Sequence, residues 1–230
     1  MKKFSHHYYN SLLKDADSKE GSVDEIIIPE LYITELPDFF KDLYVKGDFD
    51  VAGNKLTSCK NFPKTLGTRA YVYRNQISSL EGLQRLPSIR FDIFDNKLTS
   101  LEYFNELPLP RCKLMLFGNN QITSCKGLEN IFCEKLIMSN NEISSWEYLP
   151  QGVIDLQFSR NKLTSWKGMP SGLKTLYVNG NWDVEDFKDY KEVNHTLIIS
   201  TSHWKYTQKI SEHMRSRGIT PPLEIYHLED

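Results

Sequence analysis

The side chains that most often carry enzyme chemistry are scattered in this 230-residue chain rather than gathered into a motif. None of the histidines stands in an HExxH motif or near a cysteine at the spacing of metal ligands. The six histidines are His6, His7, His195, His203, His213 and His227. The sequence also lacks a glycine-rich phosphate loop and a GxSxG nucleophile motif. We therefore predict that the protein is not an enzyme and that it holds no metal and no cofactor.

The cysteines could act as nucleophiles, metal ligands or disulfide partners, but their spacing favours none of these roles. No CxxC pair occurs among Cys59, Cys112, Cys125 and Cys133. Each cysteine instead falls at an inward, apolar position of a repeat that runs through the chain. Buried cysteine behaves as a small apolar side chain. We expect four buried and reduced thiols, which is typical of a reducing compartment.

A short repeat provides the elements that must position all other residues. The motif N-x-[LI]-[TS]-S occurs six times, with successive asparagines 20 to 24 residues apart. These residues are Asn54, Asn75, Asn96, Asn120, Asn141 and Asn161, and a degraded copy begins at Asn181. A period of this length is typical of a solenoid, whose units stack to form one core. The asparagine amides can satisfy backbone groups in the bend after each strand, so we interpret them as structural.

Apolar residues stand five and three positions before each asparagine, as expected for a short strand with alternate side chains pointing inward. These pairs are Phe49/Val51, Ala70/Val72, Phe91/Ile93, Met115/Phe117, Leu136/Met138, Leu156/Phe158 and Leu176/Val178. Extending the pattern to Ile26/Ile28 and Leu197/Ile199 predicts about nine parallel strands. Trp146 and Trp166 fall in another inward column, so we assign them to the core. The long step of 24 residues after Asn96 predicts an insertion in a loop away from the strands.

A solenoid must cover the two ends of its core, and the terminal regions have suitable sequences. We therefore expect one continuous domain with a helical N-terminal cap and connector (1–22), leucine-rich repeats (23–182) and an α/β C-terminal cap (183–230). The helices expected in these caps span residues 5–16, 183–191 and 203–217, and a final strand spans 223–228.

The sequences of the repeats are similar to those of a known superfamily. VKGDFDVAGNKLTSCKNFPKTL and YRNQISSLEGL resemble the repeats of leucine-rich repeat proteins of tailed bacteriophages, and the likeness covers residues 22–182. The resemblance implies an α/β solenoid with its parallel strands on a concave face, and a small accessory protein that acts in the host cell. Bacterial leucine-rich repeat effectors that act as ubiquitin ligases need a catalytic cysteine in a large C-terminal domain. Residues 134–230 contain no cysteine, so the sequence does not fit that group.

Charge and hydropathy exclude two classes of partner. The 28 Lys and Arg residues against 30 Asp and Glu residues give a net charge of −2, which argues against nucleic acid as the main partner. No apolar run approaches the roughly 18 residues of a membrane span, and the N-terminus lacks the apolar region of a signal peptide. We expect no membrane association and a cytoplasmic location, which is the host cytoplasm if the protein is phage-encoded.

The outward positions of four neighbouring strands carry large apolar side chains that folding does not require there. These residues are Tyr71, Tyr73, Phe94, Leu114, Leu116 and Ile137. A charged rim is expected beside them, formed by Arg69, Arg74, Arg90, Asp92 and Asp95. A contiguous apolar patch of this kind is typical of a protein interface, and aromatic residues are enriched at its hot spots. Two alternatives are that a terminal segment folds over the patch, and that aromatic residues simply suit strands.

These observations favour a non-enzymatic recognition module that binds a protein partner of unknown identity on its concave face. The resemblance implies a phage-encoded protein acting on a host or viral protein. The alternative is a structural or assembly component of a virion or complex, in which the same patch or the caps could support self-association.

Overall fold

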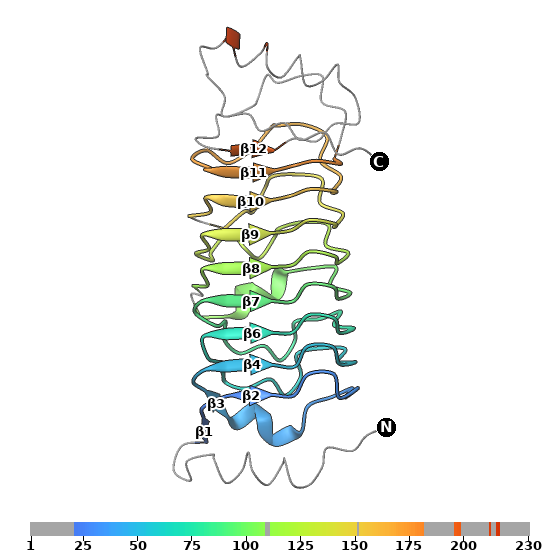
Figure 1. Cartoon of the computed structure of the whole chain (residues 1–230), viewed down its shortest axis with the longest axis vertical. Coiled ribbons are helices and arrows are strands. Elements are labelled where there is room, and N and C mark those ends of the chain that lie inside the picture. The colour runs from blue at the N-terminus through green and yellow to red at the C-terminus, as the bar shows by residue number, and fades with distance from the viewer. Residues whose placement is uncertain are drawn as a thin grey trace.

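The computed structural model describes residues 21–108, 111–150, 152–181, 196–198, 212, 215 and 216, and it has the form of a parallel β-solenoid (Figure 1). Each turn adds one short strand to a nine-stranded parallel sheet, and consecutive turns lie side by side in it. The strands are β2 (Ile26–Ile27), β4 (Asp48–Asp50), β6 (Arg69–Tyr71), β7 (Arg90–Asp92), β8 (Leu114–Leu116), β9 (Lys135–Ile137), β10 (Asp155–Gln157), β11 (Thr175–Tyr177) and β12 (Thr196–Ile198). The prediction of a solenoid is confirmed.

A smaller parallel sheet lies beside the first turns. It contains β1 (Ser22–Val23), β3 (Tyr44–Val45) and β5 (Thr65–Leu66). The described connections contain two short 3₁₀ helices, η1 (Asp38–Asp42) and η2 (Glu102–Glu106). The remaining connections are mainly turns and extended chain.

The α/β character that we expected is not found in the described repeats, which contain almost no helix. The lack of helix has a physical reason at the position seven residues after each asparagine of the repeat, which we call the ladder asparagines. In most turns the backbone is left-handed there. The residues there include Asn61, Gly82, Gly127, Tyr148 and Gly168, all with positive φ. A right-handed helix cannot continue through such a residue, so the connections turn instead.

The core consists of the inward residues that the repeat predicted. The described pairs from Ile26/Ile28 to Leu176/Val178 are all buried, and most are completely so. Trp146 is buried and stacks on Phe158 and Trp166 of the next turn, with ring centroids 5.3 and 6.2 Å from its own. The prediction that both tryptophans belong to the core is confirmed.

The extra residues between Asn96 and Asn120 lie in the connection between β7 and β8. They leave the sheet uninterrupted, because these two strands pair directly. Helix η2 lies in this connection, behind the sheet in Figure 1. Its Phe104 is buried and packs edge-on against Phe91 and Phe117 of the core. The inserted stretch therefore adds an aromatic side chain to the core from the side opposite the strands.

The ladder asparagines join each turn to the one before it. The Nδ2 of Asn96 donates hydrogen bonds to the carbonyl oxygens of Val72 and Ile93, at 3.1 and 3.2 Å. Its Oδ1 accepts the N–H of Ile77, at 2.9 Å. Asn120 also donates to the carbonyl of Ile93, so the bonds form a continuous series along the solenoid. The structural interpretation of this column is confirmed.

The residue before each repeat asparagine, and before Leu31 at the equivalent position of the first turn, is left-handed, which completes the bend after the strand. These residues are Glu30, Gly53, Arg74, Asp95, Asn119, Asn140, Arg160 and Gly180, with φ between 53° and 68°. At Gly53 there is also no room for a side chain, because a Cβ would lie 2.9 Å from Cγ of Glu30. The bend therefore combines a positive φ with an asparagine that satisfies its backbone groups.

The expected helices 5–16 and 183–191 and the final strand 223–228 lie outside the described residues. Of the expected helix 203–217, residues 212, 215 and 216 are described, and they are helical. Within the described part of the chain, no helix has the length and apolar character needed to cross a membrane.

We predict that Asn96→Ala lowers the free energy of unfolding by about 2 kcal/mol, because the buried N–H of Ile77 then has no acceptor. Urea unfolding followed by circular dichroism measures the change. The matched control is Asn105→Ala on the exposed side of η2, which should change stability by less than about 0.5 kcal/mol. Equal effects of the two variants would contradict a structural role for the asparagine column.

Candidate functional site

The strand register brings the predicted site residues together on the outward face of the nine-stranded sheet. Tyr71, Asp92, Leu116 and Ile137 occupy the same position on four successive strands. Arg69, Arg90, Leu114 and Lys135 form a second column two residues earlier. Neighbouring strands lie about 4.8 Å apart, so the side chains within a column are in contact range.

Tyr73 and Phe94 extend this surface beyond the ends of their strands. The carbonyl of Tyr73 accepts the N–H of Gly53, and the carbonyl of Phe94 accepts the N–H of Arg74, both within 3.0 Å. The in-register pairing therefore continues to these residues. All six predicted apolar side chains are half-buried on this face. We call this set the apolar patch: Tyr71, Tyr73, Phe94, Leu114, Leu116 and Ile137.

One rim residue departs from our prediction. Asp92 was expected to be exposed, but it is only 4% exposed. Its Oδ2 accepts a hydrogen bond from Arg90 at 2.7 Å, and its Oδ1 accepts the N–H of Phe94 at 3.2 Å. These donors offset the cost of burying the carboxylate. Asp92 therefore positions neighbouring groups, and a partner would not contact it directly.

Arg90 is held in place from two sides. Besides its ion pair with Asp92, its guanidinium lies over the ring of Tyr71, 5.4 Å from the centroid. Its Nε is buried and has no hydrogen-bond partner in the described part of the chain. Arg90 is thus ordered before any partner binds, whereas Arg69 is exposed and makes a longer ion pair of 3.7 Å with Asp48.

Phe94 has a role in packing as well as on the surface. A Cβ at Gly118 would lie 2.8 Å from two carbons of the Phe94 ring, so the ring covers the backbone of the next turn. Gly118 is correspondingly buried. The apolar patch is therefore supported by the side chain that follows β7, which already packs on the turn of β8.

Two acidic residues on β4 border the patch, and the sequence prediction did not include them in the site. Asp48 and Asp50 occupy both outward positions of this strand, and Asp50 is in register with Tyr71. Burial raises the pKa of Asp50, and Asp48 contributes in the same direction, while the N–H of Ala52 opposes the rise. The sequence signal was the Asp-Phe-Asp triplet, which places two carboxylates on one face of a strand.

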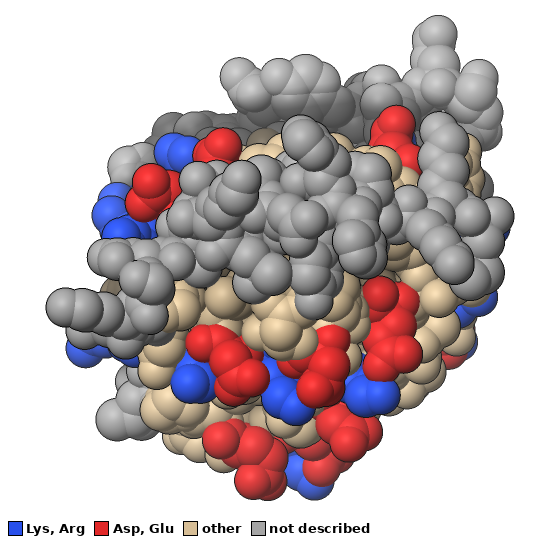
Figure 2. Space-filling view, turned by 90° about the horizontal axis from the view of Figure 1, so that it is seen from below, with Lys and Arg blue, Asp and Glu red and all other residues tan. Residues whose placement is uncertain are grey.

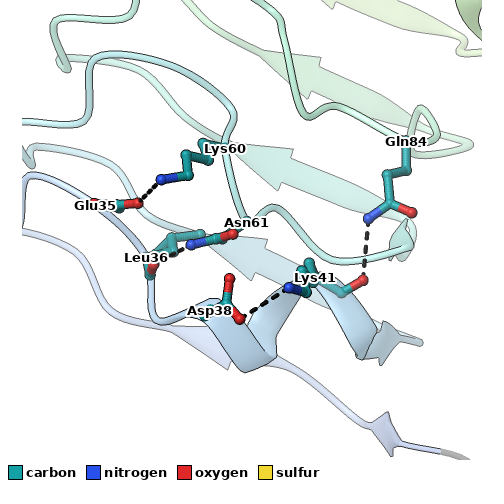
Figure 3. Close-up of polar contacts among 7 residues, drawn as sticks. All are labelled: Glu35, Leu36, Asp38, Lys41, Lys60, Asn61 and Gln84. Carbon is teal, nitrogen blue, oxygen red and sulfur yellow. Dashed lines mark hydrogen bonds and ion pairs between the residues drawn. The ribbon is translucent and has the colours of Figure 1, made fainter.

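The charged side chains at the N-terminal end pair with one another. Lys60 and Glu35 form an ion pair of 2.6 Å, and Lys41 and Asp38 form one of 2.9 Å (Figure 3). Gln84 donates a hydrogen bond to the carbonyl of Lys41 in the same region. Where described residues are visible from this end, positive and negative side chains lie next to each other (Figure 2). Among the described residues seen from this end, the two signs of charge are therefore interspersed.

The cysteines provide no accessible nucleophile. All four are free and buried, as the repeat predicted. Burial raises the pKa of the Cys59 thiol, and it raises the pKa values of the Cys112, Cys125 and Cys133 thiols to about 12. Among the described residues, no group of three or more His, Cys, Asp or Glu side chains could hold a metal ion.

The six predicted apolar residues thus lie together on one face of the described chain. No protein-family model matches the chain, and no curated protein is significantly similar to it.

We predict that the four thiols resist alkylation by iodoacetamide near pH 8 in the folded protein and react after unfolding in urea, because only the exposed thiolate is nucleophilic. Mass spectrometry of the intact chain counts the modified cysteines. Since their folded pKa values exceed the ordinary value of 9.0, they also make stability fall as the pH rises from 9.0 towards 12. Rapid modification of the folded protein would contradict the buried positions.

Proposed function

We propose that the protein is a non-enzymatic recognition module of the leucine-rich repeat type that binds another protein. The binding surface is the outward face of the nine-stranded sheet, which the repeat resemblance implies to be concave. The observation that carries this proposal is the apolar patch, whose side chains come from consecutive strands and stand on the face opposite the core.

The boundaries of the patch argue against a general preference of strands for aromatic residues. The same outward columns on β10 and β11 carry Asp155, Gln157 and Thr175, followed by an isolated Tyr177. The large outward side chains of the patch therefore lie on β6, β8 and β9 and directly after β6 and β7, and they are followed by polar residues on β10, while Ile27 on β2 lies apart from them, beyond Asp50. A discrete apolar area next to polar strands is typical of a binding site.

Side chains of the patch and its rim are held in place by their neighbours, which also supports a role in recognition. Arg90 is fixed by Asp92 and Tyr71, and the Phe94 ring rests on Gly118. Side chains that are already ordered lose less conformational entropy on association, so more of the contact energy contributes to affinity. Aromatic and arginine side chains in such positions frequently dominate binding energy.

The resemblance to repeats of tailed-bacteriophage proteins supports a phage-encoded protein that acts on a host or viral protein in the host cytoplasm. In this proposal the terminal regions 1–22 and 183–230 cover the two ends of the repeat core. The repeats are of a variety whose connections are extended or 3₁₀ rather than α-helical.

We predict that Leu116→Glu removes partner capture without unfolding the protein, because Leu116 lies on the outward face and not in the core. The measurement compares proteins recovered from a bacterial host lysate by wild type and variant. The matched control is Gln157→Glu, which adds the same charge in the same outward column on β10. Equal recovery by wild type and Leu116→Glu would contradict the proposed surface.

Once a partner is identified, truncation should distinguish the patch from the rest of the sheet. We expect Tyr71→Ala to weaken binding by about 2 kcal/mol or more, as is typical of a central aromatic contact. Tyr177→Ala removes the same side chain from β11 and should change the affinity little. Isothermal titration calorimetry gives both values, and a larger loss at Tyr177 would place the interface elsewhere.

The alternative function, a structural component of a virion, predicts a different result. The protein would then be recovered from purified particles at fixed copy number.

A further inference from the structure

The dimensions of the apolar patch, taken together with Asp50 at its border, indicate what kind of partner segment fits on it. Four strand steps separate Asp50 on β4 from Ile137 on β9, which is about 19 Å along the solenoid. The outward positions from Leu114 to Gly118 span about 13 Å across it. The bordered area therefore measures about 19 by 13 Å. A single α-helix, about 10 Å wide, has matching dimensions.

The backbone of the sheet favours a helix over an added strand. In the nine-stranded sheet, β4, β6, β7, β8 and β9 are each paired on both sides, so this face offers no free strand edge to a partner. A segment that crosses these strands must satisfy its own backbone hydrogen bonds, which a helix does. One helical turn advances 5.4 Å, close to the strand spacing of about 4.8 Å. Side chains one turn apart on a helix can therefore meet successive strands.

The charge at the β4 end indicates which side chain the helix would place there. Asp48 is paired with Arg69, whereas Asp50 has no ion-pair partner within the described part of the chain. Asp50 is half-buried and lies in register between Ile27, which is 39% exposed, and Tyr71. A lysine or arginine complements such a position, because its alkyl stem covers apolar neighbours while its charge meets the carboxylate.

We propose that the occupant of this surface is an amphipathic helix of a partner protein, lying along the solenoid axis. It places a lysine or arginine over Asp50 and an apolar stripe over Leu116 and Ile137, and it passes Tyr71 where the Arg90 guanidinium lies over the ring. This inference rests on the proposed function and specifies the chemistry of its partner.

The test uses the full-length protein and a randomised library of helix-forming peptides of about 15 residues displayed on yeast. We expect wild type to enrich peptides that carry a lysine or arginine next to an apolar stripe. Their affinity should fall about tenfold for Asp50→Lys and be restored when the peptide lysine is changed to glutamate. Asp155→Lys makes the same change on β10, outside the patch, and should leave affinity unaltered.

Asp50→Asn guards against a folding defect, because it keeps an acceptor for the N–H of Ala52 while removing the charge. A smaller loss of affinity is expected for this variant. If binding requires Leu116 but shows no preference for a basic residue, the inference is wrong and the proposed function stands. If no enriched peptide depends on Leu116 or Tyr71, the inference and the proposed function are both wrong. Sedimentation velocity that reveals a dimer dissociated by Leu116→Glu would identify a second copy as the occupant and overturn the inference.

Discussion

The fold depends on how the backbone is satisfied in the bend after each strand. Strands of two or three residues pair over a short length, and the chain then turns away from the sheet. Each ladder asparagine supplies an acceptor and donors at this point, and its hydrogen bonds reach both its own turn and the preceding one. Because the same side chain closes the bend and joins two turns, it fixes the spacing and the register of the stack.

The candidate binding surface is a consequence of that register. Residues about 20 positions apart in the sequence, such as Leu116 and Ile137, become neighbours because every turn repeats the same alignment. A slip by one residue would turn Met115 outward and Leu116 into the core, since side chains alternate between the two faces of a strand. The interactions that stabilise the solenoid therefore also determine which side chains a partner can meet.

Features that repeat with the period could be predicted from the sequence, and features that depend on a single neighbour could not. The inward pairs, the asparagine column and the buried Trp146 follow from their places in the repeat. The lack of α-helix in the described connections was missed because it depends on a left-handed position. Gly82 occupies that position in one turn and Tyr148 in another, so residue type gave no uniform signal.

Asp50 and Asp92 show how one neighbour decides the role of an equivalent residue. Both occupy the same outward column, and both accept the backbone N–H two residues later. The residue two positions earlier differs: Arg90 neutralises Asp92 and allows its burial, whereas Asp48 adds a second negative charge beside Asp50. An Arg-Phe-Asp strand thus pairs its own charges, whereas the Asp-Phe-Asp strand leaves the Asp50 carboxylate without an ion pair in the described part of the chain. The same position in the repeat can therefore serve either the fold or a partner, according to the pairing of charges within a single strand.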